Sequence, residues 1–144
     1  MDYLSTGSLQ TTDVRRRITR LALWFNGAGE AHRIDGIARA ALAPVWFETI
    51  HPFEGGNGRI GRAISDKALA QDMKRSARLL RVSQQMWLDR EGYYAQLQAV
   101  TGKANLDVTP WLMWFVGCVE KAGLAGVAHM QTAATRANNS DAST

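Results

Sequence analysis

One short segment of the chain combines a histidine, a run of glycines and two arginines. It covers residues 51–62 and reads HPFEGGNGRIGR. An unperturbed imidazole titrates at about pH 6.5, so His51 can act as a general base at neutral pH. Pro52 disfavours the helical region for the residue before it, which predicts that His51 stands at a helix C-terminus, facing the next turn.

The glycines that follow predict a turn able to bind an anion. Gly55, Gly56, Asn57 and Gly58 permit positive φ angles and let a ligand approach the backbone closely. Successive amides in such a turn attract anions, and so does the N-terminus of the helix that follows. Asn57 can add a side-chain hydrogen bond. A plain glycine-rich connection between helices is the simpler interpretation, and it would be preferred for the turn alone.

Two arginines favour the anion interpretation. Arg59 and Arg62 are spaced to share one helix face, and each guanidinium can bind phosphate oxygens in a bidentate manner. Gly56, Gly58 and Gly61 also match the dinucleotide pattern G-x-G-x-x-G, but the β-strand that this pattern requires is missing. A P-loop is excluded, because Arg59 stands where that motif needs lysine. The segment therefore predicts a site that brings a hydroxyl group to the phosphates of a nucleotide.

Length and composition describe one globular domain. The chain has 144 residues, of which 46% are hydrophobic and 21% charged. Cys118 is the single cysteine, which excludes an internal disulfide and predicts a reducing, cytoplasmic setting or delivery into a host cell. The N-terminus does not resemble a signal peptide, and we expect no membrane span because no apolar stretch approaches about 20 residues.

The net charge of +4 comes with two basic clusters, which can attract nucleotides, nucleic acid or acidic proteins or can simply form solvated helix faces. No nucleic-acid-binding signature accompanies them, so solvated faces are favoured and no nucleic-acid partner is expected. His32 and His129 have no metal-ligand spacing with His51, and no role is assigned to them. The clusters are Arg15, Arg16, Arg17 and Arg20, and Lys74, Arg75, Arg78 and Arg81.

The elements that position residues 51–62 are predicted to be helices. Apolar spacing and caps place them at 13–26, capped by Asp13, at 34–50, from Arg59 or Arg62 to about Lys74, at 83–100, capped by Ser83, and from Thr109 onward. Pro44 is expected to kink or divide the second. The aromatic residues of the last helix, Trp111, Trp114 and Phe115, are expected in the core. Residues 1–10 could be extended, and 132–144 are predicted to be a disordered tail.

Residues 51–62 closely resemble HPFx[DE]GN[GK]RxxR, the signature of the Fic (filamentation induced by cyclic AMP) family. The resemblance extends to LALWFN at 21–26, VWFETI at 45–50, REGYY at 90–94 and LDVTPWLMWFVGC at 106–118. The later segments are similar to the DUF4172-associated type of Fic/DOC protein. The resemblance implies an all-α Fic-fold helical bundle over residues 1–131, with a short extended flap remnant at the N-terminus.

The resemblance also implies a protein adenylyltransferase, which transfers AMP from ATP to a Ser, Thr or Tyr hydroxyl of a target protein. His51 would be the catalytic base. Gly56, Asn57 and Gly58 would hold the α- and β-phosphates. By the same resemblance, Arg59 would bind the β-phosphate, Arg62 would bind the γ-phosphate, Phe53 would be a buried anchor of the loop, and Tyr93 and Tyr94 would lie near the adenine.

One position departs from the family signature. Gly55 stands where the family has an acidic residue that binds Mg²⁺, and Glu54 is the adjacent candidate ligand. The alternative is therefore a catalytically weakened nucleotide-binding pseudoenzyme or an interaction module; removal of AMP is a third possibility. The family's inhibitory motif is missing, since Trp87 stands where Ser or Thr should precede Glu91. An inhibitory partner, such as an antitoxin, is expected to supply it unless an inhibitory segment has been removed.

Overall fold

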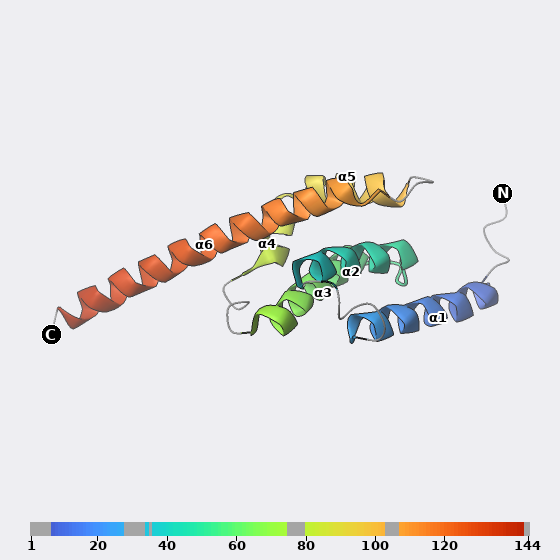
Figure 1. The fold of residues 1–144 in the computed structure, drawn as a ribbon, viewed down its shortest axis with the longest axis horizontal. Helices are drawn as coiled ribbons and strands as arrows, with labels where there is room; N and C mark the ends of the chain where they lie inside the picture. The colour runs from blue at the N-terminus through green and yellow to red at the C-terminus, as the bar shows by residue number, and fades with distance from the viewer. Residues whose placement is uncertain (1–6, 28–33, 35, 75–79, 103–106, 143–144) are drawn as a thin grey trace.

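The fold consists of α-helices arranged around a central pair (Figure 1). This computed structural model describes residues 7–27, 34, 36–74, 80–102 and 107–142. Over those ranges it has no β-strand, which confirms the predicted all-α class. The helices are α1 (Gly7–Phe25), α2 (Gly36–Ile50), α3 (Asn57–Met73), α4 (Val82–Leu88), α5 (Arg90–Thr101) and α6 (Thr109–Asp141).

Helices α2 and α3 form the centre of the molecule, with α1 on one side and α5 and α6 on the other (Figure 1). Helix α2 is apolar nearly all round, as is typical of a helix buried on every side. Ala40, Ala41 and Ala43 are fully buried in it. These small side chains allow the neighbouring helices to approach closely, and the loop that joins α2 to α3 is thereby fixed at both ends.

Pro44 lies inside α2 without dividing it. Proline has no N–H, so it cannot donate the usual hydrogen bond to the carbonyl of Ala40. The hydroxyl of Ser65 in α3 donates to that carbonyl oxygen instead, at 2.9 Å. Trp111 Nε1 of α6 donates to the next carbonyl, that of Ala41, at 2.8 Å. Two neighbouring helices thus supply hydrogen bonds at the point where proline weakens the helix.

The core between α2, α5 and α6 is aromatic. Trp111 and Phe115 are fully buried, as predicted, and Tyr93 packs edge-on against Trp111 with 5.8 Å between ring centroids. Leu124 does not belong to this core, because it is 67% exposed. Leu124 lies on the exposed face of α6, between the buried residues Ala122 and Gly126.

The segment predicted as one helix over residues 83–100 is divided at Asp89. Its carboxylate caps α5 by accepting a hydrogen bond from the N–H of Gly92 at 3.2 Å, and it also accepts one from Trp114 Nε1 at 2.9 Å. These hydrogen bonds stabilise a break at Asp89 more than an uninterrupted helix would be stabilised. Ser83 is not a cap but lies within α4, where its N–H donates to Asp66 at 3.1 Å.

Other helix starts also differ from prediction. Asp13 lies inside α1, where its carboxylate pairs with Arg16 and Arg17 at 2.6 Å each, and Thr109 is the first helical residue of α6 rather than its cap. Residues 7–10 are already helical, so the extended segment considered there is wrong, while residues 1–6 lie outside the described part. The arginines within residues 15–20 are exposed, as a solvated face predicts.

Helix α6 continues to Asp141, where we predicted a disordered tail from residue 132. The alanines and the arginine of this stretch are good helix formers, and they extend a helix that the core has already nucleated. Its side chains are exposed throughout residues 132–142. The last residues, 143 and 144, lie outside the described part of the chain.

By length and composition alone, α6 could also cross a membrane. Its most apolar window has a mean hydropathy of 1.2, and 28% of that window is buried. The expectation that no segment approaches such a span therefore does not hold for α6. Core helices of globular domains meet the same measures, and the buried Trp111, Phe115, Cys118 and Ala122 account for part of the apolar composition.

Candidate functional site

The loop between α2 and α3 begins with His51 at the helix end, as predicted. The N–H of His51 still donates to the carbonyl of Phe47 at 3.0 Å, but its φ angle is +46°, so the chain leaves the helix at this residue. Pro52 explains why the helix ends here, because it disfavours the right-handed helical region for the residue before it. The imidazole is 64% exposed, which leaves it accessible to a macromolecular substrate.

Asn57 holds the loop closed. Its side-chain oxygen accepts a hydrogen bond from the N–H of Phe53 at 3.2 Å, and its amide nitrogen donates to the carbonyl of Phe53 at 2.6 Å. The residue itself is buried. The side chain predicted to contact phosphate is therefore engaged within the loop, and its backbone N–H is the group that it offers at the helix N-terminus.

Phe53 is not the buried anchor that the family resemblance implies. It is 51% exposed, and its ring lies 6.3 Å from that of Phe47. The loop is anchored instead through the backbone of Phe53, which donates one hydrogen bond to the Asn57 side chain and accepts another from it. Because those bonds fix the main chain, the side chain does not have to be buried.

The glycine-rich turn ends at Gly56, which caps α3 in a left-handed conformation with φ +82°. Helix α3 starts at Asn57, earlier than the predicted start at Arg59 or Arg62. The turn and the side-chain hydrogen bonds of Asn57 hold this residue in place as the first of the helix. The first N–H groups of a helix have no acceptor within the helix. Those of Asn57 and Gly58 therefore stand at the positive end of the α3 dipole, which favours an anion.

Substituting Gly56 with alanine should destabilise the fold by about 1–2 kcal/mol, because a left-handed φ is unfavourable for any residue with a Cβ atom. The added methyl group itself meets no atom within 4 Å, so backbone strain is the whole effect. Gly55→Ala is the matched control, since its Cβ also meets nothing and its φ is not in this region. Chemical denaturation measures both, and equal losses in the two variants would contradict the assigned conformation.

A pocket of about 470 Å³ opens beside this turn. Aromatic side chains from α4 and α5 complete a wall that the motif residues begin. Trp87 is the member that the sequence did not indicate, because α4 meets the motif only through the tertiary fold. The lining residues are Gly56, Gly58, Arg59, Arg62, Trp87 and Tyr94.

Arg62 is the most unusual side chain of the site. It is only 7% exposed, and its guanidinium lies over the rings of Trp87 and Tyr93, at 4.9 Å and 5.2 Å from their centroids. Its buried Nη1 has no hydrogen-bond partner among the described residues. Leaving a buried charged donor without an acceptor costs free energy. Arg59 is exposed at the same pocket, so the two predicted phosphate ligands do share one face of α3.

Tyr93 and Tyr94 lie at different depths in the site. Tyr94 lines the pocket, and a Cβ atom at Gly58 would lie 2.8 Å from its hydroxyl, so glycine is what allows this approach. Tyr93 is fully buried behind the pocket and donates to Glu48 Oε1 at 3.2 Å. Burial, followed by the charge of Glu48, raises the pKa of Tyr93 far above its ordinary value, so the phenol stays protonated.

Free space surrounds Gly55, the position at which the family signature has an acidic residue. Gly55 is exposed, and a side chain added there would meet no atom within 4 Å. Glu54 beside it is also exposed. No group of three or more His, Cys, Asp or Glu residues able to hold a metal occurs among the described residues. The residues present therefore do not form a metal site by themselves.

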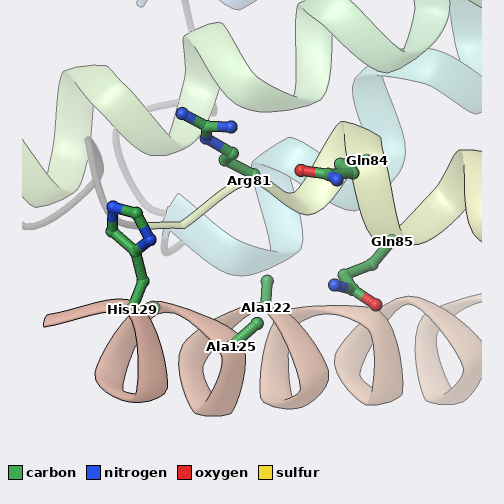
Figure 2. Close-up of a pocket in the computed structure, with 7 residues that line it drawn as sticks. Arg81, Gln84, Gln85, Ala122, Ala125 and His129 are labelled. Atoms are coloured by element: carbon green, nitrogen blue, oxygen red, sulfur yellow. The ribbon is translucent and has the colours of Figure 1, made fainter. Parts of the chain in front are cut away.

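A second pocket, of about 380 Å³, lies between the start of α4 and the middle of α6 (Figure 2). Arg81 and His129 border it from opposite elements, together with Gln84 and Gln85 (Figure 2). Its lining includes no carboxylate and no nucleophile, and both basic side chains are exposed. We therefore place the candidate site at the loop, where a buried charge, a helix N-terminus and a histidine coincide.

These features define an all-α protein with a polar pocket at a glycine-capped helix N-terminus. Residues 4–69 match the model of the Fic/DOC family, and the match includes α1, α2 and the loop and ends within α3. This part of the chain is therefore similar to the Fic/DOC family. That family is generally linked to AMPylation and nucleotidyl transfer, which indicates a transferase in general terms. The DUF4172-associated subtype stays a prediction.

Proposed function

We propose that the chain is a protein adenylyltransferase, which transfers AMP from ATP to a Ser, Thr or Tyr hydroxyl of a target protein. The observation that carries the proposal is the buried guanidinium of Arg62, whose Nη1 lacks a hydrogen-bond partner at the edge of the pocket. Such a group is stabilised when an anion arrives. Beside a glycine-rich helix N-terminus, phosphate oxygens are the acceptors that best suit it.

In the proposed reaction the acceptor hydroxyl oxygen bonds to the α-phosphorus of ATP, and its proton passes to His51. The bond between the α-phosphorus and the oxygen that bridges to the β-phosphate breaks, and pyrophosphate leaves. The backbone N–H groups at the start of α3 hold the α- and β-phosphates, while Arg59 and Arg62 neutralise the β- and γ-phosphates. Such transfers depend mainly on positioning and on stabilising charge, which these groups supply.

The exposed rings at the pocket supply a place for the nucleobase. Trp87 and Tyr94 both line the pocket and are about half exposed. Aromatic faces stack on nucleobases, and such stacking contributes about 1–3 kcal/mol per base. We therefore assign the base to these two rings. Tyr93, which the resemblance implied for this role, lies behind them and is fully buried.

Magnesium enters the proposal only with the nucleotide. Mg²⁺ usually keeps several waters and is held by substrate phosphates with one or two carboxylates. Gly55 supplies no carboxylate, and Glu54 is the nearest acidic side chain in sequence. No step of the reaction is assigned to a metal held by the protein.

Intact-mass analysis after incubation with ATP and Mg²⁺ tests donor and reaction type together. We expect the chain, or a target protein in a lysate, to gain the mass of one adenylyl group. The exposed His51 can take the proton from an accessible hydroxyl as that hydroxyl attacks the α-phosphorus of bound ATP. A gain equal to one phosphoryl group would contradict the proposal and indicate a kinase. We expect the adenylyl product because Gly58 stands where a lysine would indicate phosphoryl transfer.

One observation favours a second candidate function, a nucleotide-binding module without transferase activity: Gly55 leaves the acidic position empty. The variant Gly55→Asp separates the two. Since the added side chain meets no atom within 4 Å, it should be accommodated without loss of stability. We expect it to raise the rate of AMP transfer by about 10-fold or more, because it adds a carboxylate that can hold Mg²⁺ against the phosphates.

The control is Gly55→Asn, which has nearly the same shape without the charge. Rates measured against Mg²⁺ concentration should rise for the aspartate variant and stay at the wild-type level for the asparagine variant. If the wild type and both variants bind ATP and transfer nothing, the binding module is the correct function. If both variants gain equally, the missing metal ligand is not what limits the wild type.

The target protein is proposed as a separate chain, because His51 is exposed at the surface rather than enclosed. The pocket is likewise open to a partner that inserts a carboxylate toward Arg62. We propose that an inhibitory protein acts in this way. The single cysteine is consistent with a reducing compartment, where a cytosolic target would be met.

A further inference from the structure

We propose that Glu48 is a positioning residue that orients the imidazole of His51, keeping its Nδ1 proton facing inward and leaving Nε2 free to accept a proton. Its catalytic consequence rests on the proposed transfer reaction, but the orientation itself does not. The carboxylate belongs to the last turn of α2 and its side chain is only 6% exposed. Sequence reasoning missed it, although an acid three residues before His51 lies on the same helix face.

The two oxygens of Glu48 face different partners. Oε1 accepts a hydrogen bond from the buried hydroxyl of Tyr93 at 3.2 Å, and Oε2 lies 3.7 Å from His51 Nδ1. The second distance is longer than a hydrogen bond, but a rotation of the exposed imidazole can close it. Catalytic hydrogen bonds are often long before the substrate is bound and shorten in the complex.

Groups from α3 and α5 lie close to this carboxylate. A Cβ atom at Gly61 or Gly58 of α3 would lie 3.3 Å or 3.4 Å from Oε1, so glycine at both positions leaves room for it. Burial raises the pKa of the Glu48 carboxyl. The hydrogen bond from Tyr93 opposes that shift, followed by the charges of His51 at the end of α2 and Arg62 in α3. Glu48 therefore touches the proposed base and faces the proposed phosphate ligand.

The proton balance follows from the imidazole chemistry. A neutral imidazole carries one N–H, and a carboxylate near Nδ1 favours that nitrogen as the donor. The lone pair then lies on Nε2, which takes the proton of the acceptor hydroxyl as the oxygen bonds to phosphorus. The resulting imidazolium faces the Glu48 carboxylate. Its extra proton leaves to water afterwards, since the ring is exposed.

The test is Glu48→Gln, read by the ring-nitrogen NMR shifts of His51, which a His51→Gln spectrum assigns. Tyr93 needs an acceptor, so the new amide oxygen should stay toward Tyr93 and the NH₂ group should face His51. Nδ1 must then accept a hydrogen bond, and the ring proton moves to Nε2. We expect Nδ1–H in the wild type and Nε2–H in the variant, with no nucleotide needed for either measurement.

The kinetic readout is AMP transfer. With Nε2 protonated the base is lost, so kcat should fall at least about 100-fold, as expected when a general base carries the wrong tautomer. The KM for ATP should change less than about 3-fold, because the substitution does not alter how ATP binds in the ground state. Glu91→Gln, a change at an exposed carboxylate on α5, should alter neither the tautomer nor the rate.

An Nε2–H imidazole in the wild type overturns the proposal, even if the variant fails to fold. An unchanged tautomer in a folded Glu48→Gln variant also overturns it. Loss of ATP affinity with no tautomer change would show that Glu48 serves only as a counter-charge for Arg62. The expected change of tautomer in a chain that transfers no AMP would support the orientation and contradict the proposed function.

Discussion

Replacing Arg62 with leucine should weaken ATP binding by about 100-fold or more while leaving the fold stable. The guanidinium is buried and its Nη1 has no hydrogen-bond partner, so the pocket gains most from an anion that provides one. Removing one partner of a buried, hydrogen-bonded charge pair costs about 2–5 kcal/mol, which sets the size of the expected loss. Titration calorimetry with ATP and Mg²⁺ measures it directly.

The same substitution should change the free energy of unfolding by less than about 1 kcal/mol. Leucine removes the cation–π contacts with Trp87 and Tyr93, each contributing roughly 0.5–1 kcal/mol or more. It also removes a charged donor that is buried without an acceptor, which offsets that loss. Arg90→Leu is the matched control, because Arg90 lies over the Trp87 ring at 5.5 Å without lining the pocket. Equal ATP affinity in wild type and Arg62→Leu would contradict the phosphate assignment.

His51→Ala should reduce AMP transfer by about 100- to 10,000-fold, the range expected for loss of a general base. ATP binding should stay at the wild-type level, because His51 does not line the pocket and its imidazole is exposed. Transfer rates under single-turnover conditions and calorimetry on the same preparation separate the two effects.

His129→Ala is the control for loss of an imidazole. His129 lies on α6 at the second pocket (Figure 2), and no part of the proposed reaction uses it. Its removal should leave transfer unchanged. A His51→Ala variant that transfers AMP as fast as the wild type would show that another group, or water alone, removes the proton from the acceptor hydroxyl.

The parts of the site that are local in sequence could be predicted from the sequence. Pro52 places His51 at a helix end, and the spacing of Arg59 and Arg62 brings both to one pocket. The glycine with the left-handed conformation, Gly56, belongs to the turn where positive φ angles were expected. Each of these features depends on residues a few positions apart, which is the range that motif and capping rules describe.

The parts of the site that depend on tertiary packing could not be predicted in this way. Trp87 reaches the site only because α4 packs against the central pair of helices, and no short-range pattern encodes that contact. Tyr93, the buried partner of Glu48, likewise comes from α5. Phe53 was expected to be buried, but Asn57 fixes the loop through the main chain and leaves the ring exposed. A side-chain role carried over from a family signature does not determine burial.

The predicted helix boundaries were wrong where a single side chain changed the path of the backbone. Asp89 breaks the predicted helix because its carboxylate finds two donors, from Gly92 and Trp114, that an uninterrupted helix would not offer it. Residues 132–144, which include the last turns of α6, are predicted to be disordered from their polar composition. Their helix-forming residues instead continue a helix that begins in the core.

The most direct test of the central claim uses two samples of ATP, one labelled at the α-phosphorus and one at the γ-phosphorus. The chain is incubated with each, with Mg²⁺ and a cell lysate, beside the His51→Ala and Arg62→Leu variants. We predict protein labelling from the α-labelled sample only, lost in both variants. Labelling from the γ-labelled sample, or α-label that persists without His51 and Arg62, would contradict AMP transfer at this pocket.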